Sequence, residues 1–337
     1  MSVAYPGNDH RLGGYEAPPA IISMFLGEEI EDIVDSIVDE RVYTDHKAAT
    51  MNLGIPSVPT FRKDTTDRNR TSPFAFTGNK FEFRSLGSSQ NIAMPNVVLN
   101  TAVAKVLADM ADELEAAMGQ GQEFAPAVAA VIKNTLAAHK RIIYNGNGYS
   151  QEWMAEAARR GLSNLRTTVE SCEVLTSPKA VELFSRFGVL SSVELRARQE
   201  IMLENYAKVL NIEAQTMILM ATRQIIPAVE AYMTHLGEAA RAKLLVLEDD
   251  RSAIRMERDL IRRLSELNTA TYDAVAALRQ ADREATTAGD ALAIAVAFRD
   301  KVVPAMAALR APVDEMETLV SSEYWPLPTY GEIMHKQ

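Results

Sequence analysis

The stretch SSVELRARQEIMLENYAKVLNIEAQTMIL, residues 191–219, decides the fold class of this chain. Its apolar residues return at steps of three, four or seven, which is the repeat of one face of an α-helix. The members of this stripe are Leu195, Met202, Tyr206, Val209, Ile212 and Leu219. The stretch therefore predicts one very long amphipathic helix that begins at Ser191.

Two further stripes with the same spacing follow downstream. The second stripe consists of Ile261, Leu264, Thr271, Val275 and Leu278, and the third of Val296, Val303, Met306, Val313, Met316 and Val320. Three long apolar stripes bury their faces by packing against one another, as a bundle or a coiled-coil hairpin. We therefore expect an antiparallel helical bundle from about residue 176 to the end, kinked at Pro227 and Pro304. The aromatic segment 324–330 is expected to dock on it as an apolar strap.

The part before residue 90 is broken into short pieces by glycine and proline. Residues 21–26 predict a buried strand, and residues 27–39 a short acidic helix. Residues 77–84 predict a strand, because Lys80, Glu82 and Arg84 alternate with two phenylalanines and fall on the opposite face. After Pro95, two alanine-rich helices are expected at 97–118 and 125–143. The predicted fold class is mainly α with a minor β part (α+β).

Two Asn-Gly pairs in YNGNGY, residues 144–149, make this segment the best internal boundary. We therefore expect two domains, residues 1–148 and residues 149–337.

Composition excludes several classes of protein. The 337 residues are 47% apolar and 24% charged, which favours a folded chain with a sizeable core. The net charge of −10 argues against a nucleic-acid or anionic-membrane binder. The single cysteine, Cys172, excludes an intramolecular disulfide and a cysteine-cluster zinc site. No apolar run suits a membrane span or a signal peptide, and we expect a cytoplasmic protein.

The residues best suited to chemistry lie before residue 90. Segment 62–84 carries six basic and three acidic residues, and guanidinium groups suit carboxylates and phosphates. On the predicted strand, Glu82 and Arg84 can hold a divalent metal and an anionic substrate side by side. On spacing alone, a surface ion pair is the simpler interpretation of these two residues. Glu16 follows Gly13-Gly14 on a segment that resembles a mobile loop, where a carboxylate can close over a site and take a proton.

Taken together, these motifs resemble a known family. The strings RLGGYEAP (11–18), RNR (68–70) and FEFR (81–84) occur in this order in the C-terminal half of the glutamine synthetase catalytic domain. The string RTSPFAFTGNK (70–80) resembles the type III class of that family, as do LSNLRTT (162–168), LENY (203–206) and YWPLPTY (324–330). The resemblance covers essentially the whole chain. It implies the C-terminal portion of that antiparallel-sheet domain, followed by a long-helix bundle.

The resemblance also implies a reaction and roles for named residues. Glutamine synthetases use ATP to phosphorylate the γ-carboxylate of glutamate, and ammonia then displaces the phosphate. Glu16 would shield the γ-glutamyl phosphate and help deprotonate ammonium, and Arg11 would lie beside the substrate. Arg70 would face the transferring phosphoryl group. Glu82 would bind Mg²⁺ or Mn²⁺, and Arg84 would hold a carboxylate of glutamate.

The chain also departs from the family pattern. The commoner glutamine synthetases carry another arginine where this chain has Ala75, and Lys80 is a candidate for the missing charge at the phosphate. The family's N-terminal β-grasp domain and first metal-ligand strands are absent from these residues. We therefore expect a C-terminal fragment that is inactive alone. Glutamate, ammonia and ATP are the implied partners, together with further copies of the chain (a dodecamer in the family). The alternative is a non-catalytic helical module that assembles with full-length glutamine synthetase.

Overall fold

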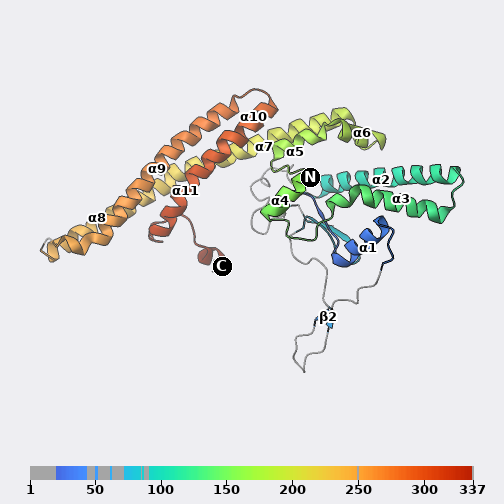
Figure 1. The fold of residues 1–337 in the computed structure, drawn as a ribbon. Helices are drawn as coiled ribbons and strands as arrows, with labels where there is room; N and C mark the ends of the chain where they lie inside the picture. Colours follow the sequence, from blue (N-terminus) through green and yellow to red (C-terminus); the bar gives the residue numbers. More distant parts are fainter. Residues whose placement is uncertain are drawn as a thin grey trace. The chain divides into compact units, whose positions relative to one another are not determined.

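The computed structural model describes residues 20–43, 50–51, 61–62, 72–84, 86, 91–248 and 250–335. The chain divides into two compact units, Met1–Met202 and Leu203–Gln337 (Figure 1). The described residues are largely helical with a small β part, which confirms the predicted fold class. The domain boundary expected near residue 148 stays a prediction.

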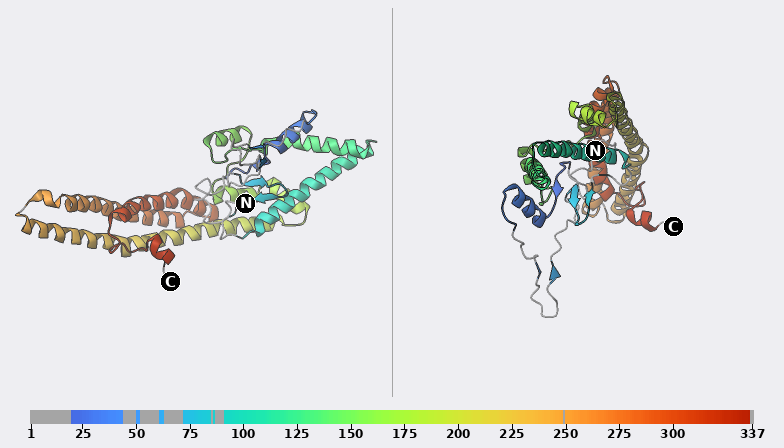
Figure 2. Two further views of the ribbon diagram at one scale, coloured as in Figure 1. Left: turned by 90° about the horizontal axis from the view of Figure 1, so that it is seen from below. Right: turned by 90° about the vertical axis from the view of Figure 1, so that its right-hand side faces the viewer.

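Among its described residues, the first unit combines short strands with six complete helices and the start of a seventh. Its strands are β1 (Met24–Phe25), β2 (Thr50–Met51), β3 (Phe61–Arg62), β4 (Phe74–Phe76) and β5 (Phe81–Phe83). Its helices are α1 (Glu28–Val38), α2 (Ala93–Gly119), α3 (Phe124–His139), α4 (Gln151–Arg159), α5 (Thr168–Leu175) and α6 (Pro178–Arg186), with a 3₁₀ turn at Lys140–Ile142. Helices α2 and α3 form an antiparallel hairpin, and α1 lies against α3 (Figures 1 and 2).

The small sheet has the strand order β1-β4-β5. Strand β1 pairs in parallel with β4, whereas β4 and β5 pair antiparallel as a hairpin. The predicted strand at residues 77–84 was too long, because residues 77–80 form the turn of this hairpin. The Thr77 amide donates to the Lys80 carbonyl at 2.9 Å, and Gly78 takes a positive φ of 94° that favours glycine. The strand expected at 21–26 is likewise reduced to Met24–Phe25.

Asn145 fastens the first strand and helix of this unit to the segment after α3. Its Oδ1 accepts hydrogen bonds from the amides of Leu26 (3.0 Å) and Gly27 (2.9 Å), and its Nδ2 donates to Glu31. The neighbouring Tyr144 stacks on the buried indole of Trp153, with ring centroids 3.8 Å apart. The hydrogen bonds of Asn145 join residues more than a hundred positions apart in the sequence.

The second unit contains the bundle. Its helices are α8 (Ile226–Val246), α9 (Arg255–Thr286), α10 (Ala291–Ala297), α11 (Val303–Leu319) and α12 (Tyr330–His335), together with the C-terminal part of α7 (Ser192–Met220) and a 3₁₀ turn at Arg251–Ile254. Ser191 caps α7 as the sequence predicted, because its Oγ accepts from the Glu194 amide while Glu194 accepts from the Ser191 amide. Helix α9 runs antiparallel to α8 and packs against α8 and α11 (Figures 1 and 2).

Both prolines expected to kink their helices follow a π-helical turn. Ala221–Ile225 precedes Pro227, and Phe298–Val302 precedes Pro304. Proline has no amide hydrogen and its ring collides with the carbonyl one turn earlier, so a wider turn relieves the crowding. Each proline is therefore accompanied by a π-helical turn inside an otherwise continuous helix, and the kinks themselves stay a prediction.

Part of the apolar stripes was predicted wrongly. Ile212 and Leu219 are 65% and 56% exposed, and Val303 is also exposed. On the second half of α7 the buried residues are two alanines, Ala207 and Ala214, together with Ile218. Large aliphatic side chains at helical spacing suggested the wrong face, because alanines at a helix contact allow the neighbouring backbone to approach closely. The stripe on α9 was predicted well: Leu264, Thr271, Val275 and Leu278 are buried, and Ile261 is half-buried.

The core of the bundle comes from three helices and the segment after α11. It contains Ile225, Val229, Leu236, Leu264, Leu267, Met316 and Val320. Tyr324 and Trp325 pack against this core, as expected of the strap, and Tyr324 lies 5.4 Å from Tyr232 between ring centroids. Tyr330, at the other end of the strap, is 85% exposed, so only the first part of the segment docks. None of the described helices is long and apolar enough to cross a membrane.

Candidate functional site

The β4-β5 hairpin sorts its side chains onto two faces. The register pairs Phe74 with Phe83 and Phe76 with Phe81, so the four aromatic rings share one face. Phe81 lies 5.6 Å from Phe74 and 5.2 Å from Phe76 between ring centroids. This aromatic contact fixes the register of the hairpin. It thereby directs the polar residues of β5 to the opposite face, as the alternation predicted.

Three charged residues meet on that opposite face. Arg84 donates from Nε and Nη2 to Oε2 of Glu82, at 3.1 and 3.0 Å. The Nζ of Lys80 lies 3.1 Å from the other oxygen, Oε1 of Glu82. The hydrogen bonds from Lys80 and then Arg84 hold the pKa of Glu82 below its ordinary value. The structure therefore brings together the three predicted site residues that lie on β5 and beside it, with Glu82 ionised between two cations.

The exposures of these side chains differ in a way that suits ligand binding. The Arg84 side chain is 16% exposed, whereas Glu82 is 36% and Lys80 is 64% exposed. The Arg84 amide donates to the Pro73 carbonyl at 2.8 Å, which anchors its backbone across the hairpin. A guanidinium on a fixed backbone is suited to bidentate binding of a carboxylate. A new anion at Arg84 would have to exchange places with Glu82.

The position that departs from the family pattern lies beside this charged group. Ala75 is fully buried in β4 and stands directly opposite Glu82 in the register. Paired residues of two strands lie on the same face, so an arginine here would have been next to Glu82. Lys80 already contacts Glu82 in the same neighbourhood. The role of Lys80 as a substitute for the missing positive charge stays a prediction.

The residues of this hairpin do not form a metal site by themselves. A hard divalent cation takes six or more oxygen ligands, and Glu82 is one carboxylate between two cations. Within the described parts of the chain, no three histidine, cysteine, aspartate or glutamate side chains gather closely enough to hold a metal ion. Arg11, Glu16 and Arg70, the other predicted site residues, lie outside the described residues, and their roles stay predictions.

Comparison with known proteins shows which proteins this chain is similar to. Residues 127–243 match the family described as "Glutamine synthetase C-terminal domain". The chain is 37% identical over 339 residues to "Type-3 glutamine synthetase" of Dictyostelium discoideum, covering 99% of this chain and 45% of that protein.

Two bacterial proteins named "Glutamine synthetase" match over nearly the same span. The one from Butyrivibrio fibrisolvens is 38% identical over 335 residues, and the one from Bacteroides fragilis (strain YCH46) is 35% identical over 338 residues. Each match covers 99% of this chain, but only 47% and 46% of the relative. The chain thus spans less than half the length of the curated relatives it matches. Over nearly its whole length it is similar to a C-terminal part of type-3 glutamine synthetases.

Proposed function

We propose that this chain provides part of the active site of a glutamine synthetase, which joins ammonia to L-glutamate at the expense of ATP through γ-glutamyl phosphate. The observation that carries the proposal is the Lys80–Glu82–Arg84 group on one face of the β4-β5 hairpin. Sequence identity of 35–38% along 99% of the chain supports it. The assigned class is an ATP-dependent ligase of nitrogen metabolism.

Arg84 is assigned the role of binding a carboxylate of glutamate. Its guanidinium is mostly buried and already forms a two-donor contact with a carboxylate, that of Glu82. The glutamate carboxylate would replace Glu82 at the same donors. The free-energy cost of this exchange is small when Glu82 gains another partner at the same time. The buried guanidinium then stays paired throughout, and Glu82 is not left unpaired either.

Glu82 is assigned the role of a ligand to a divalent metal ion. When bound, this ion would neutralise the phosphates of ATP. Glu82 would be one ligand among several, and the remaining ligands would come from outside the described residues. Lys80 is assigned to phosphate, because it is the most exposed cation of the group and can turn toward a ligand. Arg70 would act on the same phosphoryl group, with Arg11 beside the substrate and Glu16 closing over the γ-glutamyl phosphate.

The test is an assay of glutamine formation from glutamate, ammonia, ATP and Mg²⁺ or Mn²⁺ in two settings. The purified chain alone is expected to make no glutamine, since Glu82 by itself binds metal weakly. In a complete enzyme that carries these residues, Arg84→Lys should raise the KM for glutamate and leave the KM for ATP nearly unchanged, because lysine cannot bind a carboxylate bidentately. Lys105→Gln, at a half-buried lysine of α2 that pairs with Asp109, is the matched control. An unchanged glutamate KM in Arg84→Lys would overturn the assignment of Arg84.

Glu16→Ala in the same complete enzyme tests the role of Glu16 separately from the roles of the hairpin residues. A carboxylate that acts after phosphoryl transfer should leave both Michaelis constants nearly intact. Turnover with ammonia should fall, and ATP should be consumed without glutamine because water reaches the acyl phosphate. Coupled turnover at the normal rate would remove Glu16 from the mechanism.

A second candidate function is a helical module that assembles with other glutamine synthetase chains. The observation that favours it is an exposed apolar stripe on α2, where Val103, Val106 and Leu107 are 55%, 44% and 61% exposed at helical spacing. Contiguous exposed apolar surface marks contact with another protein. Light scattering after size-exclusion chromatography should show an oligomer that Leu107→Glu disrupts. If this variant keeps the native mass, the stripe has no role in assembly.

A further inference from the structure

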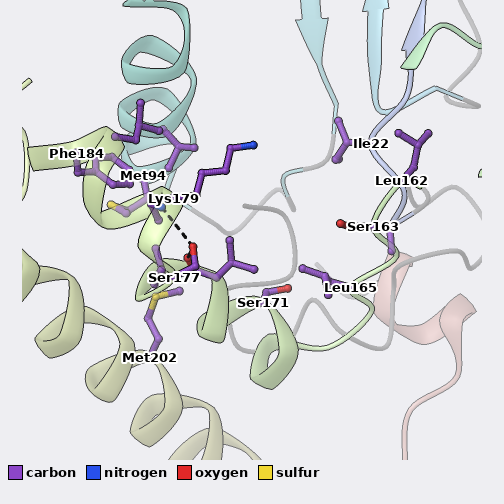
Figure 3. Close-up of a pocket in the computed structure, with 16 residues that line it drawn as sticks. Ile22, Met94, Leu162, Ser163, Leu165, Ser171, Ser177, Lys179, Phe184 and Met202 are labelled. Carbon is purple, nitrogen blue, oxygen red and sulfur yellow. Dashed lines mark hydrogen bonds between the residues drawn. The ribbon is translucent and has the colours of Figure 1, made fainter. Parts of the chain in front are cut away.

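The first unit contains a cavity that the proposed ligase reaction does not use. Its volume is about 470 Å³, within the range typical of small-molecule sites. The segment before β1, the start of α2, the segment at 162–165, helices α5 and α6, and the first half of α7 contribute its walls (Figure 3). All of these lie within the first unit.

The walls of the cavity are mostly apolar. The apolar residues that line it include Ile22, Met94, Val98, Leu165, Leu183 and Phe184. Apolar walls favour an apolar ligand body, because burial removes its surface from water. No aspartate or glutamate is among the described lining residues, so none of these side chains repels an anion.

One polar group in the wall is buried without a partner. Ser171 on α5 is 7% exposed, and its Oγ has no hydrogen-bond partner among the described residues. A buried hydroxyl without a partner loses its hydrogen bonds to water and gains none in exchange. Ser171 lines the cavity, so a polar atom of a ligand can supply the missing hydrogen bond (Figure 3).

The charge of the cavity is set by Lys179. Its side chain extends from the first turn of α6 (Figure 3), is exposed, and forms no ion pair with a described residue. Ser177, by contrast, is fully used: it accepts from the Ala180 amide at 3.3 Å and donates to the Val174 carbonyl at 2.8 Å.

We propose that this cavity binds a small amphipathic monocarboxylate. The apolar body would fill the space between α2, α5 and α6. The carboxylate would pair with the Lys179 ammonium, and the Ser171 hydroxyl would donate to the ligand. The proposal is independent of glutamine synthesis, because no residue of the Lys80–Glu82–Arg84 group lines the cavity.

The experiment is a calorimetric titration of the purified chain with octanoate, 1-octanol and octylamine, which share one apolar body and differ in the head group. Octanoate is expected to bind at one site per chain. Octanol should bind several-fold more weakly, and octylamine more weakly still because of repulsion from Lys179. Absence of saturable octanoate binding, or equal affinity for octanol, would overturn the proposal.

Substitutions of lining residues test whether octanoate binds in this cavity. Lys179→Gln should weaken octanoate about threefold to fivefold, the effect of one solvent-exposed charge pair, and should leave octanol unchanged. Ser171→Ala should weaken octanoate without lowering the melting temperature, because its hydroxyl bonds to no described residue. Val174→Trp, at a half-exposed wall position, should block all three compounds. Lys208→Gln, an exposed lysine on α7 outside the cavity, is the matched control. Unchanged octanoate affinity in Lys179→Gln would contradict the assigned charge pair.

Discussion

Arg84 directs two donors, Nε and Nη2, to the same oxygen of Glu82, while the other carboxylate oxygen faces Lys80. Both oxygens of Glu82 are therefore engaged, and the carboxylate shields two cations from each other. Removing Glu82 would leave Lys80 and Arg84 on the same strand face with unbalanced charge. The protonation state of Glu82 therefore decides whether Lys80 and Arg84 have an anionic partner. The pKa of Glu82 can be measured directly.

The titration of Glu82 is the first prediction. Because the hydrogen bonds from Lys80 and Arg84 lower its pKa, carbon-13 NMR of the side chain should give a midpoint below the ordinary 4.5. A lowered pKa means that the ion pairs stabilise the fold above the ordinary value, and that this stabilisation is lost as the pH falls through the lowered pKa. In Lys80→Gln the midpoint should rise, whereas Lys105→Gln should not change it. A native midpoint at or above 4.5 would contradict the geometry of the group.

The second prediction concerns a buried carboxylate in the bundle. Asp282 on α9 is 6% exposed and accepts from Asn211 Nδ2 at 2.9 Å and Gln215 Nε2 at 2.6 Å, both on α7. Asp282→Ala leaves both amides without their acceptor, so it should lower the free energy of unfolding by about 1–3 kcal/mol. Asp273→Ala changes an exposed aspartate of the same helix and should have little effect. Equal stabilities in urea denaturation would mean that water replaces Asp282 at no cost.

The third prediction concerns Gly146, where the chain passes close to an aromatic ring. A Cβ at this position would lie 2.5 Å from the Tyr144 hydroxyl, and that ring is held by its stacking on Trp153. Gly146→Ala should therefore destabilise the chain by about 1–3 kcal/mol through overpacking.

Gly119, the last residue of α2, is the matched control for this change. It has open space around its Cβ position, so Gly119→Ala should be neutral or stabilising by up to about 1 kcal/mol. The comparison is made by thermal unfolding, and a neutral Gly146→Ala would show that Tyr144 can move aside.

The fourth prediction compares two apolar residues that the sequence pattern treated alike. Leu264 is fully buried in the core of the bundle, whereas Ile212 is 65% exposed. Leu264→Ala should cost about 2–5 kcal/mol, and Ile212→Ala should stay within about 0.5 kcal/mol. Denaturant titrations of the two variants measure this difference directly. Similar costs for both variants would mean that Ile212 is buried in solution, for instance against another chain.

The sequence predicted those parts of the fold that depend on local spacing. The start of α7 at Ser191, the burial of Leu264 and Leu278 on α9, and the two faces of β5 all follow from period and capping, which are local properties. The exposed face of α7 could not be predicted in this way. A pattern of large apolar residues does not show where alanines such as Ala214 admit a neighbouring helix.

The functional features likewise include some that the sequence predicts and some that it does not. Lys80, Glu82 and Arg84 lie within five residues of one another, so strand alternation alone brought them to one face. The cavity around Ser171 and Lys179 had no signal in the sequence, because segments from residue 20 to residue 202 contribute to it. A single buried hydroxyl without a partner becomes visible only when the side chains around it are in place.

The contacts of Asn145 have a consequence for the chemical ageing of the chain. An asparagine followed by glycine loses its amide nitrogen when the next backbone nitrogen attacks the side chain, and this attack needs a side chain that is free to turn. Asn145 is held by Leu26, Gly27 and Glu31, whereas the side chain of exposed Asn147 accepts one bond, from the Tyr149 amide at 3.0 Å. Deamidation should therefore begin at Asn147, where it adds a surface charge. At Asn145 the same reaction would set a new carboxylate against Glu31 and loosen α1 from the rest of its unit.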